Sequence, residues 1–191
     1  IASEPRLVGF GTLDLKLGDP AGQVRRIRDL GLVGIKLHPA AQQFDVLSEQ
    51  ALAAYAEAEE LGLFLTFHTG IHWHRLRDYH VIHFDEIAYR FPRLRLSVEH
   101  VGGYHFFNEA LAVIVNNIRW RDGHRQSNVY AGLTSVFNPE NQRYWYLTPD
   151  KIAELIAQAG VDHLIFGLDF PYNKEPETRQ ALKAVDALGL S

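Results

Sequence analysis

Three polar residues lie at the carboxyl ends of apolar runs and could together hold a metal ion. His68 lies in the run LFLTFHTG, His100 in RLRLSVEHVGG and Asp169 in HLIFGLDFP. Imidazole nitrogens and a carboxylate oxygen are ligands that zinc and similar divalent ions favour. Such an ion lowers the pKa of bound water to about 7, and a nearby His or Asp can then carry the proton. The three residues therefore predict a site for one divalent metal ion, with zinc as the expected ion.

Four more polar residues extend this candidate site. Lys36 and His38 end the run LVGIKLHP and could bind an anionic substrate group or a bridging ligand, although Lys36 could also serve only to cap the interior of the fold. His72 and His74 follow His68 in a loop and could line a substrate pocket, or could be ordinary surface residues. We take all four as candidate substrate-binding residues.

Two further clusters carry weaker signals. Arg119, Arg121 and Arg125 precede an apolar run and could reach a substrate carboxylate, but a solvated loop is favoured. The aromatic segment Tyr144-Trp145-Tyr146 favours packing over binding.

The elements that position these residues alternate along the chain. Short apolar runs that end in Gly, Pro or a polar residue are typical of buried strands, and the amphipathic stretches between them are typical of helices. Asp19-Pro20, Ser48 and Thr148-Pro149 are predicted helix starts. The predicted strands are 6–15, 32–39, 63–70, 93–103, 128–135 and 163–171, and the predicted helices are 20–30, 49–61, 81–90, 105–118, 149–159 and 175–188.

Six successive strand–helix units imply parallel strands joined by right-handed crossovers. They could form an open doubly wound sheet or a closed (β/α)₈ barrel. The spacing is about 32 residues per unit, so eight units would need about 255 residues, near the ~250 of a typical barrel. We therefore expect a TIM-type α/β barrel of which residues 1–191, as one domain, supply about six of the eight units. In either fold, ligands bind at the carboxyl ends of the strands.

Side-chain alternation gives each candidate a set of neighbours on its own strand. Each candidate could thus lie above an apolar column that points into the barrel. The expected columns are Phe64 and Thr66 below His68, Leu96 and Val98 below His100, and Ile165 and Gly167 below Asp169.

An ordered set of motifs resembles the amidohydrolase-related family over nearly the whole chain. These motifs are GIKLHP (34–39), HTG (68–70), the run from FP (91–92) to EHVGG (99–103), and FGLDFP (166–171). The resemblance implies that the six strands are barrel strands three to eight. It also implies that His68 is a metal ligand, that His100 acts on the substrate or on metal-bound water, and that Asp169 binds the metal and shuttles a proton.

One family feature is absent. The resemblance predicts a His-x-His pair on the first barrel strand, but the pair His72-Trp73-His74 follows the strand of His68 and is a different element. The chain also begins at Ile1 and contains no methionine, so we expect it to be part of a longer protein.

Composition narrows the classes of partner. The net charge is -4, with 19 basic residues scattered among 23 acidic ones, which argues against nucleic-acid binding. No apolar run is long enough to span a membrane. The absence of cysteine excludes disulfides and thiolate metal sites and fits a cytoplasmic location. We expect a small-molecule substrate and leave open whether the protein forms a homo-oligomer.

The sequence thus favours a metal-dependent hydrolase that directs activated water at a small ester, lactone or amide. A nonoxidative decarboxylase of an aromatic or unsaturated carboxylic acid would use the same residues and is the closest alternative. A non-catalytic barrel relic is the second alternative, because the His-x-His pair is absent.

Overall fold

The computed structural model describes residues 8–121, 123–169 and 171–189, in which a parallel sheet carries its helices on one side. The strands of this sheet are β1 (Phe10–Gly11), β2 (Gly34–Leu37), β3 (Phe64–His68), β4 (Leu96–Glu99), β7 (Val129–Thr134) and β8 (Leu164–Gly167). The helices are α1 (Pro20–Asp29), α2 (Pro39–Gln42), α3 (Glu49–Glu60), α4 (His83–Arg90), α5 (Gly103–Asn116), α6 (Pro149–Ala159) and α7 (Glu175–Ala187), with 3₁₀ turns at Leu76–Tyr79, His100–Gly102 and Val161–His163.

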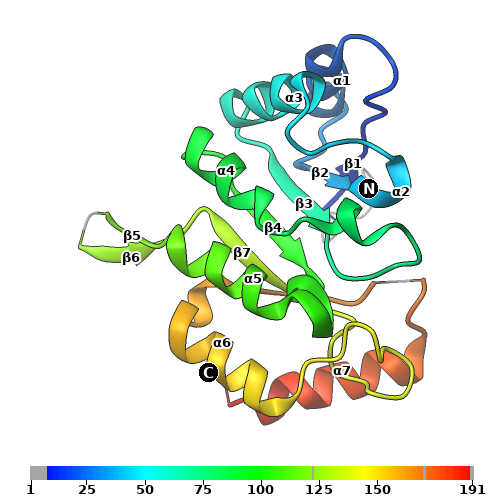
Figure 1. The fold of residues 1–191 in the computed structure, drawn as a ribbon, viewed down its shortest axis with the longest axis vertical. Helices are drawn as coiled ribbons and strands as arrows, with labels where there is room; N and C mark the ends of the chain where they lie inside the picture. The colour runs from blue at the N-terminus through cyan, green and yellow to red at the C-terminus, as the bar shows by residue number, and fades with distance from the viewer. Residues whose placement is uncertain (1–7, 122, 170, 190–191) are drawn as a thin grey trace.

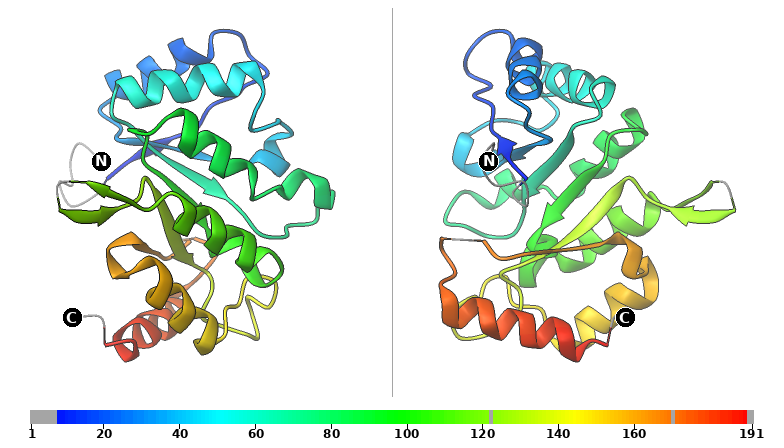
Figure 2. Two further views of the ribbon diagram at one scale, coloured as in Figure 1. Left: turned by 60° about the vertical axis from the view of Figure 1, so that its left-hand side comes forward. Right: turned by 180° about the vertical axis from the view of Figure 1, so that it is seen from behind.

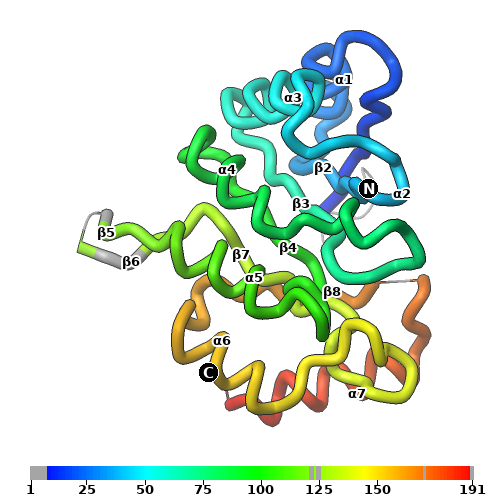
Figure 3. The backbone as a smooth tube through the Cα atoms, in the orientation of Figure 1, coloured from blue at the N-terminus to red at the C-terminus, as the bar shows by residue number. Residues whose placement is uncertain are grey.

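The strand order decides between the two predicted architectures. Among the described residues the order is β1-β2-β3-β4-β7-β8, which follows the chain, and every pair is parallel. Figure 3 traces this succession along the tube. A doubly wound sheet would reverse its strand order at a switch point, whereas a barrel adds each strand beside the last. The (β/α)₈-type fold is therefore confirmed. A closed barrel has eight strands, and the described residues form six of them.

Alternate strand residues divide the sheet into two different faces. Leu65, Phe67 and their counterparts on neighbouring strands are buried in one apolar core together with residues of the helices. The Phe67 ring lies 5.7 Å from the ring of Tyr55 on α3 and 4.8 Å from that of Phe84 on α4. Figures 1 and 2 show these helices packed along the sheet. The other face lines a cavity whose walls include Lys36 and Thr66.

The helix starts predicted at Asp19, Ser48 and Thr148 are confirmed. Each of these side chains accepts a hydrogen bond from the backbone N–H three residues further on. Such caps satisfy amide groups that have no partner inside the first turn of a helix. No helix in the described part of the chain is long and apolar enough to cross a bilayer.

The segment of Arg119, Arg121 and Arg125 differs from the expected loop. It forms an antiparallel hairpin of β5 (Arg119–Arg121) and β6 (His124–Gln126), which projects from the body in Figures 1 and 2. Arg119 is exposed and its guanidinium bonds to the carbonyl of Asn116. The side chains of Arg121 and Arg125 lie outside the described residues, so neither their solvation, which was favoured, nor the alternative of a substrate contact is tested.

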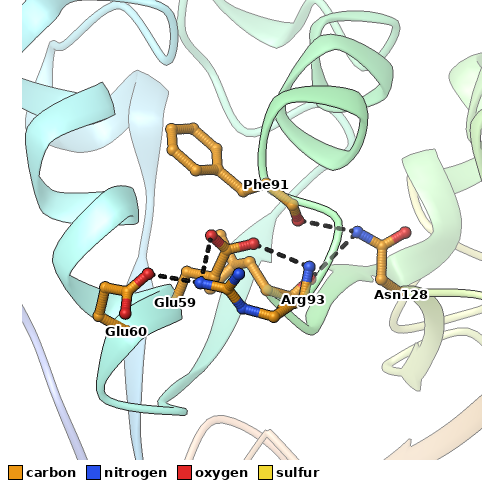
Figure 4. A network of polar contacts seen from close by, with 6 residues as sticks. Glu59, Glu60, Phe91, Arg93 and Asn128 are labelled. Atoms are coloured by element: carbon orange, nitrogen blue, oxygen red, sulfur yellow. Dashed lines mark hydrogen bonds and ion pairs between the residues drawn. The ribbon is translucent and has the colours of Figure 1, made fainter.

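A polar network fixes the entrances to β4 and β7, at the end of the sheet opposite His68 (Figure 4). The Asn128 side-chain amide donates to the carbonyls of Ala88, Phe91 and Leu94 at 3.2, 3.2 and 3.1 Å. Arg93 pairs with Glu59 and Glu60 at the end of α3, but its side chain is 64% exposed. The amide therefore joins α4 to the start of β7, while the Arg93 guanidinium of the ion pairs lies largely in solvent.

We expect the substitution Asn128→Ala to lower the free energy of unfolding by about 1–3 kcal/mol, because it removes the donor that serves these carbonyls. Arg93→Ala is the matched control from the same network and should cost less than about 1 kcal/mol, since exposed ion pairs contribute little. Urea denaturation of the two variants gives both values. Equal losses would show that Asn128 has no special part in holding α4.

Candidate metal centre

Histidines from two neighbouring strand ends stack against each other at the carboxyl edge of the sheet. His68 is the last residue of β3 and is 8% exposed. His38 follows β2 directly and caps α2, where its Nδ1 accepts from the N–H of Ala41 at 3.2 Å. The rings of His38 and His68 are nearly parallel, with centroids 3.8 Å apart. The parallel register of β2 and β3 brings these two rings together.

His100 reaches the same place by a different backbone route. β4 ends at Glu99, and His100 and Val101 then adopt left-handed backbone angles with φ of 61° and 47°. This turn breaks the strand alternation and aims the His100 ring at His68, with Nε2 and Nδ1 3.1 Å apart. The predicted column below His100 was wrong, because Leu96 and Val98 are buried in the core shared with the helices. Glu99 takes the inner face instead.

The hydrogen bonds of His100 and His68 determine their tautomers. The Nδ1 of His100 lies 2.6 Å from the carbonyl oxygen of Thr134, which only accepts, so this nitrogen carries the hydrogen. Burial is the main cause that lowers the pKa of both His100 and His68, so both rings are neutral. The Nε2 of His100 is then the acceptor, and Nδ1–H of His68 donates to it. His68 keeps a bare lone pair on Nε2.

That lone pair is the atom on which a metal site would depend. The Nε2 of His68 is buried and has no hydrogen-bond partner among the described residues. A buried polar atom without a partner is costly, and it calls for an explanation such as an ion. The nitrogens of His38, His68 and His72 lie within 4.8 Å of one another, which is compatible with one cation. The residues therefore fit a divalent metal ion.

Hydrogen bonds also determine the tautomers of His38 and His72, which differ from His68 in the group that they present. Because Nδ1 of His38 accepts from Ala41, its Nε2 carries the hydrogen and donates to Nδ1 of His72 at 3.2 Å. Burial, followed by the charges of His72 and Lys36, lowers the pKa of His38 to about 4, so this ring is neutral. The neutral tautomer of His72 that accepts at Nδ1 carries its hydrogen on Nε2. As hydrogen-bonded here, this pair presents a donor and would join the ion only after a change of tautomer, whereas His68 presents a lone pair as it stands.

His74 lies at the edge of this group. Its ring is 6.0 Å from that of His38, measured between centroids. The hydroxyl of Tyr79 accepts from the backbone N–H of His72 at 2.7 Å and from that of His74 at 3.1 Å. One buried tyrosine therefore holds the loop that carries both histidines, a role that the sequence analysis missed.

Asp169 follows β8, at the opposite edge of the sheet from β1 and β2. It has a left-handed φ of 56°, and its Oδ2 accepts from the hydroxyl of Ser135 at 3.0 Å. Asp169 lines the cavity of the inner face together with Lys36 and Glu99. Its negative charge acts to raise the pKa of both Lys36 and His100, against the effect of burial. The structure thus brings Asp169 into the electrostatic field of the histidine group.

The inner face below the histidines is charged, where an apolar column was expected. Glu99 accepts from the hydroxyls of Thr66, Ser97 and Thr134 at 2.8, 2.6 and 2.7 Å. Burial acts to raise the pKa of Glu99, but the charge of Lys36 and these hydroxyls outweigh it and lower the pKa. Burial in turn lowers the pKa of Lys36, against Glu99 and Asp169. Sequence reasoning missed Glu99, although its place beside His100 at a strand end was a signal.

Trp145 also lies at the site, although sequence reasoning favoured a packing role for it. Its ring stacks on His100 with centroids 4.7 Å apart and meets the His68 ring edge-on at 5.9 Å. Its Nε1 donates to the carbonyl of Ile71 at 3.0 Å. Packing was predicted and is found, but the surface that Trp145 packs against is the site itself.

The comparisons with known proteins agree with this geometry. The family model described as amidohydrolase matches residues 2–191. The chain belongs to the amidohydrolase family. Members of this family bind a divalent metal ion, in accord with the histidine group. The comparison with curated proteins gave no match.

Solved structures similar to this chain share its fold. They include 2,6-dihydroxybenzoate decarboxylase from Rhizobium, with a TM-score of 0.67 at 17% identity over 100% of this chain and 68% of that one. A protein of Pseudomonas putida, named provisionally as a 2-pyrone-4,6-dicarboxylic acid hydrolase, has a TM-score of 0.62 at 17% identity over 99% and 67%. A 5-carboxyvanillate decarboxylase from Novosphingobium aromaticivorans, with bound manganese, has 0.65 at 18% over 95% and 60%. The chain thus spans about three fifths to two thirds of the structures it matches.

The lowered pKa of His38 predicts an acid-dependent loss of stability in protein freed of metal. Between pH 6.5 and about 4 the unfolded chain protonates His38 while the folded chain does not, so stability falls as the pH drops through this window. The variant His38→Asn keeps a side-chain acceptor for the N–H of Ala41 and should have a shallower slope there. Urea denaturation at several pH values measures it, with exposed His105→Asn as the control. An unchanged slope in His38→Asn would contradict the assignment.

Proposed function

We propose that this amidohydrolase is a metal-dependent hydrolase that directs activated water at a small ester, lactone or amide. The observation that carries the proposal is the buried, unpartnered Nε2 of His68, which lies beside the neutral ring of His100. His68 and Asp169 would hold the ion, for which we propose zinc. When bound, such an ion polarises a carbonyl and lowers the pKa of water.

His100 is the proposed proton carrier, and Nε2 is the atom that takes up the proton. Uptake there breaks the hydrogen bond from Nδ1 of His68 and leaves the ring positively charged. Burial and the charge of Lys36 oppose this positive charge, while Glu99, the carbonyl of Thr134 and Asp169 favour it. These opposing effects suit a group that accepts a proton and returns it within one reaction.

Lys36, His38, His72 and His74 are the proposed substrate-binding residues. The tautomers derived above leave His72 with an Nε2–H donor, and His38 holds that ring in place through its hydrogen bond. Lys36 supplies an amine in the cavity below. Donors of this kind favour a substrate with an anionic or carbonyl oxygen.

A nonoxidative decarboxylase is the second candidate, and Trp145 favours it. The indole ring stacked on His100 gives the site a flat aromatic wall that suits a planar aromatic acid. In this reaction His100 first takes up a proton from solvent on Nε2. The bond from the ring to the carboxylate carbon then breaks, carbon dioxide leaves, and His100 delivers that proton to the ring carbon. Product analysis separates the candidates, because hydrolysis adds the mass of water and decarboxylation releases carbon dioxide.

We expect His68→Ala and His100→Ala to fail in different ways. Loss of a ligand weakens metal binding, so His68→Ala of the full-length protein should lose its metal. His100→Ala should keep the metal at saturating ion but lose about 10²–10⁴-fold in turnover. Metal analysis of the purified variants beside a rate assay measures both effects.

Three other outcomes would change the assignment. Equal metal loss in both variants would make His100 a ligand. Full activity and metal content in both variants would remove the catalytic role of the pair. A wild-type protein that binds no metal would favour the non-catalytic barrel over either enzyme.

A further inference from the structure

We propose that Gln142, Asn173 and Ser135 form a one-way chain of hydrogen bonds that sets which oxygen of Asp169 faces a metal ion. Ser135 is then a positioning residue, which acts on the ion through Asp169. The proposal rests on the metal-binding role of Asp169 proposed above. It comes from the directions of the hydrogen bonds, which backbone groups fix at Gln142 and at Asn173.

The chain begins at a backbone amide. The N–H of Asn138 donates to Oε1 of Gln142 at 3.1 Å, which fixes the orientation of the Gln142 amide. Its Nε2 therefore points to Asn173 and donates to Oδ1 there at 3.0 Å. Gln142 is 7% exposed, so solvent competes little for this amide.

The orientation of Asn173 is fixed a second time, independently. Its Nδ2 lies 2.8 Å from the carbonyl oxygen of Leu168, a group that only accepts. The same Nδ2 donates to the hydroxyl oxygen of Ser135 at 2.8 Å. A flipped Asn173 amide would place two donors face to face at Gln142 and two acceptors face to face at Leu168, so the direction is set.

Ser135 passes this direction to Asp169. A serine hydroxyl has one hydrogen, and its oxygen already receives a hydrogen from Asn173. The hydrogen of Ser135 therefore goes to Oδ2 of Asp169, 3.0 Å away. Among the described residues Oδ1 accepts no hydrogen bond, so Oδ1 is the oxygen available to a cation.

The backbone is shaped to hold this contact. Ser135 follows β7 and Asp169 follows β8, and both have a left-handed φ of 56°. Thr134 and Gly167, just before them, are the last register pair of these two strands. Left-handed residues other than glycine are uncommon and persist where the surroundings hold them. The two strands thus deliver a donor and a carboxylate to one point.

The variants Ser135→Ala and Asn173→Ala test the chain in the full-length protein. We expect Ser135→Ala to weaken zinc binding about 10–100-fold, the usual effect of losing a partner of a metal ligand. Asn173→Ala leaves the Ser135 hydroxyl undirected and should weaken zinc binding less. If Asn173 acts through Ser135, its substitution has no further effect once Ser135 is alanine, which a double-mutant cycle detects.

Gln180→Ala is the matched control. Gln180 accepts from the side chain of Asn138 at 2.7 Å, next to the chain but outside its direction. Its loss should leave zinc affinity unchanged. Competition with a chromophoric chelator gives the affinities, and the visible spectrum of cobalt-loaded protein reports the ligand field. The spectrum should change in Ser135→Ala and not in Gln180→Ala.

Crystal structures of the metal-free proteins separate this proposal from the proposed function. In Ser135→Ala we expect Asp169 to leave its wild-type rotamer, and this result needs no metal. A wild-type protein that binds no zinc would end the proposed function, but displacement of Asp169 would still support the positioning chain. An unmoved Asp169 in Ser135→Ala, or wild-type zinc affinity in a zinc-binding protein, would overturn it. If Ser135→Ala does not fold, Asn173→Ala decides by the same two measurements.

Discussion

The hydrogen bond from the His100 ring to the carbonyl of Thr134 sets the tautomers of His100 and His68. It places one hydrogen on Nδ1 of His100, and the neutral ring then accepts from His68, whose Nε2 is left bare. Thr134 also donates its hydroxyl to Glu99 below. Thr134, at the end of β7, thus holds the His100 ring through its backbone carbonyl and the Glu99 carboxylate through its side-chain hydroxyl. The metal-binding geometry proposed here needs both the histidines and the carboxylate below them.

The charged inner face explains why these hydroxyls occur where they do. A buried carboxylate is costly unless charge and hydrogen bonds offset the loss of water. Glu99 has three hydroxyl donors and the field of Lys36, and the glycine opposite makes room for it, since a Cβ on Gly132 would lie 2.5 Å from the Glu99 carboxylate. Small and hydroxyl-bearing residues on the inner positions are therefore a requirement of the charges that they surround.

The sequence predicts the fold well and the site only in part. Periodic burial identified the strands. Alternation grouped His68 with Thr66 and Asp169 with Gly167, and Thr66, Gly167 and Asp169 line the inner-face cavity. Alternation failed for His100, since the left-handed residues after Glu99 reverse the side chain. Trp145 came from a long connection whose path no periodic pattern encodes. The β5–β6 hairpin was missed because strands of three residues leave too short a signal.

A left-handed backbone conformation recurs after three neighbouring strands. His100 after β4, Ser135 after β7 and Asp169 after β8 all have positive φ, at 61°, 56° and 56°. Left-handed backbone in non-glycine residues is unfavourable, so its repetition at one edge of the sheet indicates a common constraint. A strand that simply continued would carry alternate side chains away from the barrel axis. After β4 and β7 the left-handed residue turns His100 and Ser135 back, and the parallel register of β4, β7 and β8 brings all three strained residues to one edge of the sheet. The sheet thereby stabilises the strained backbone at these positions, and the strained backbone orients the side chains of the candidate site.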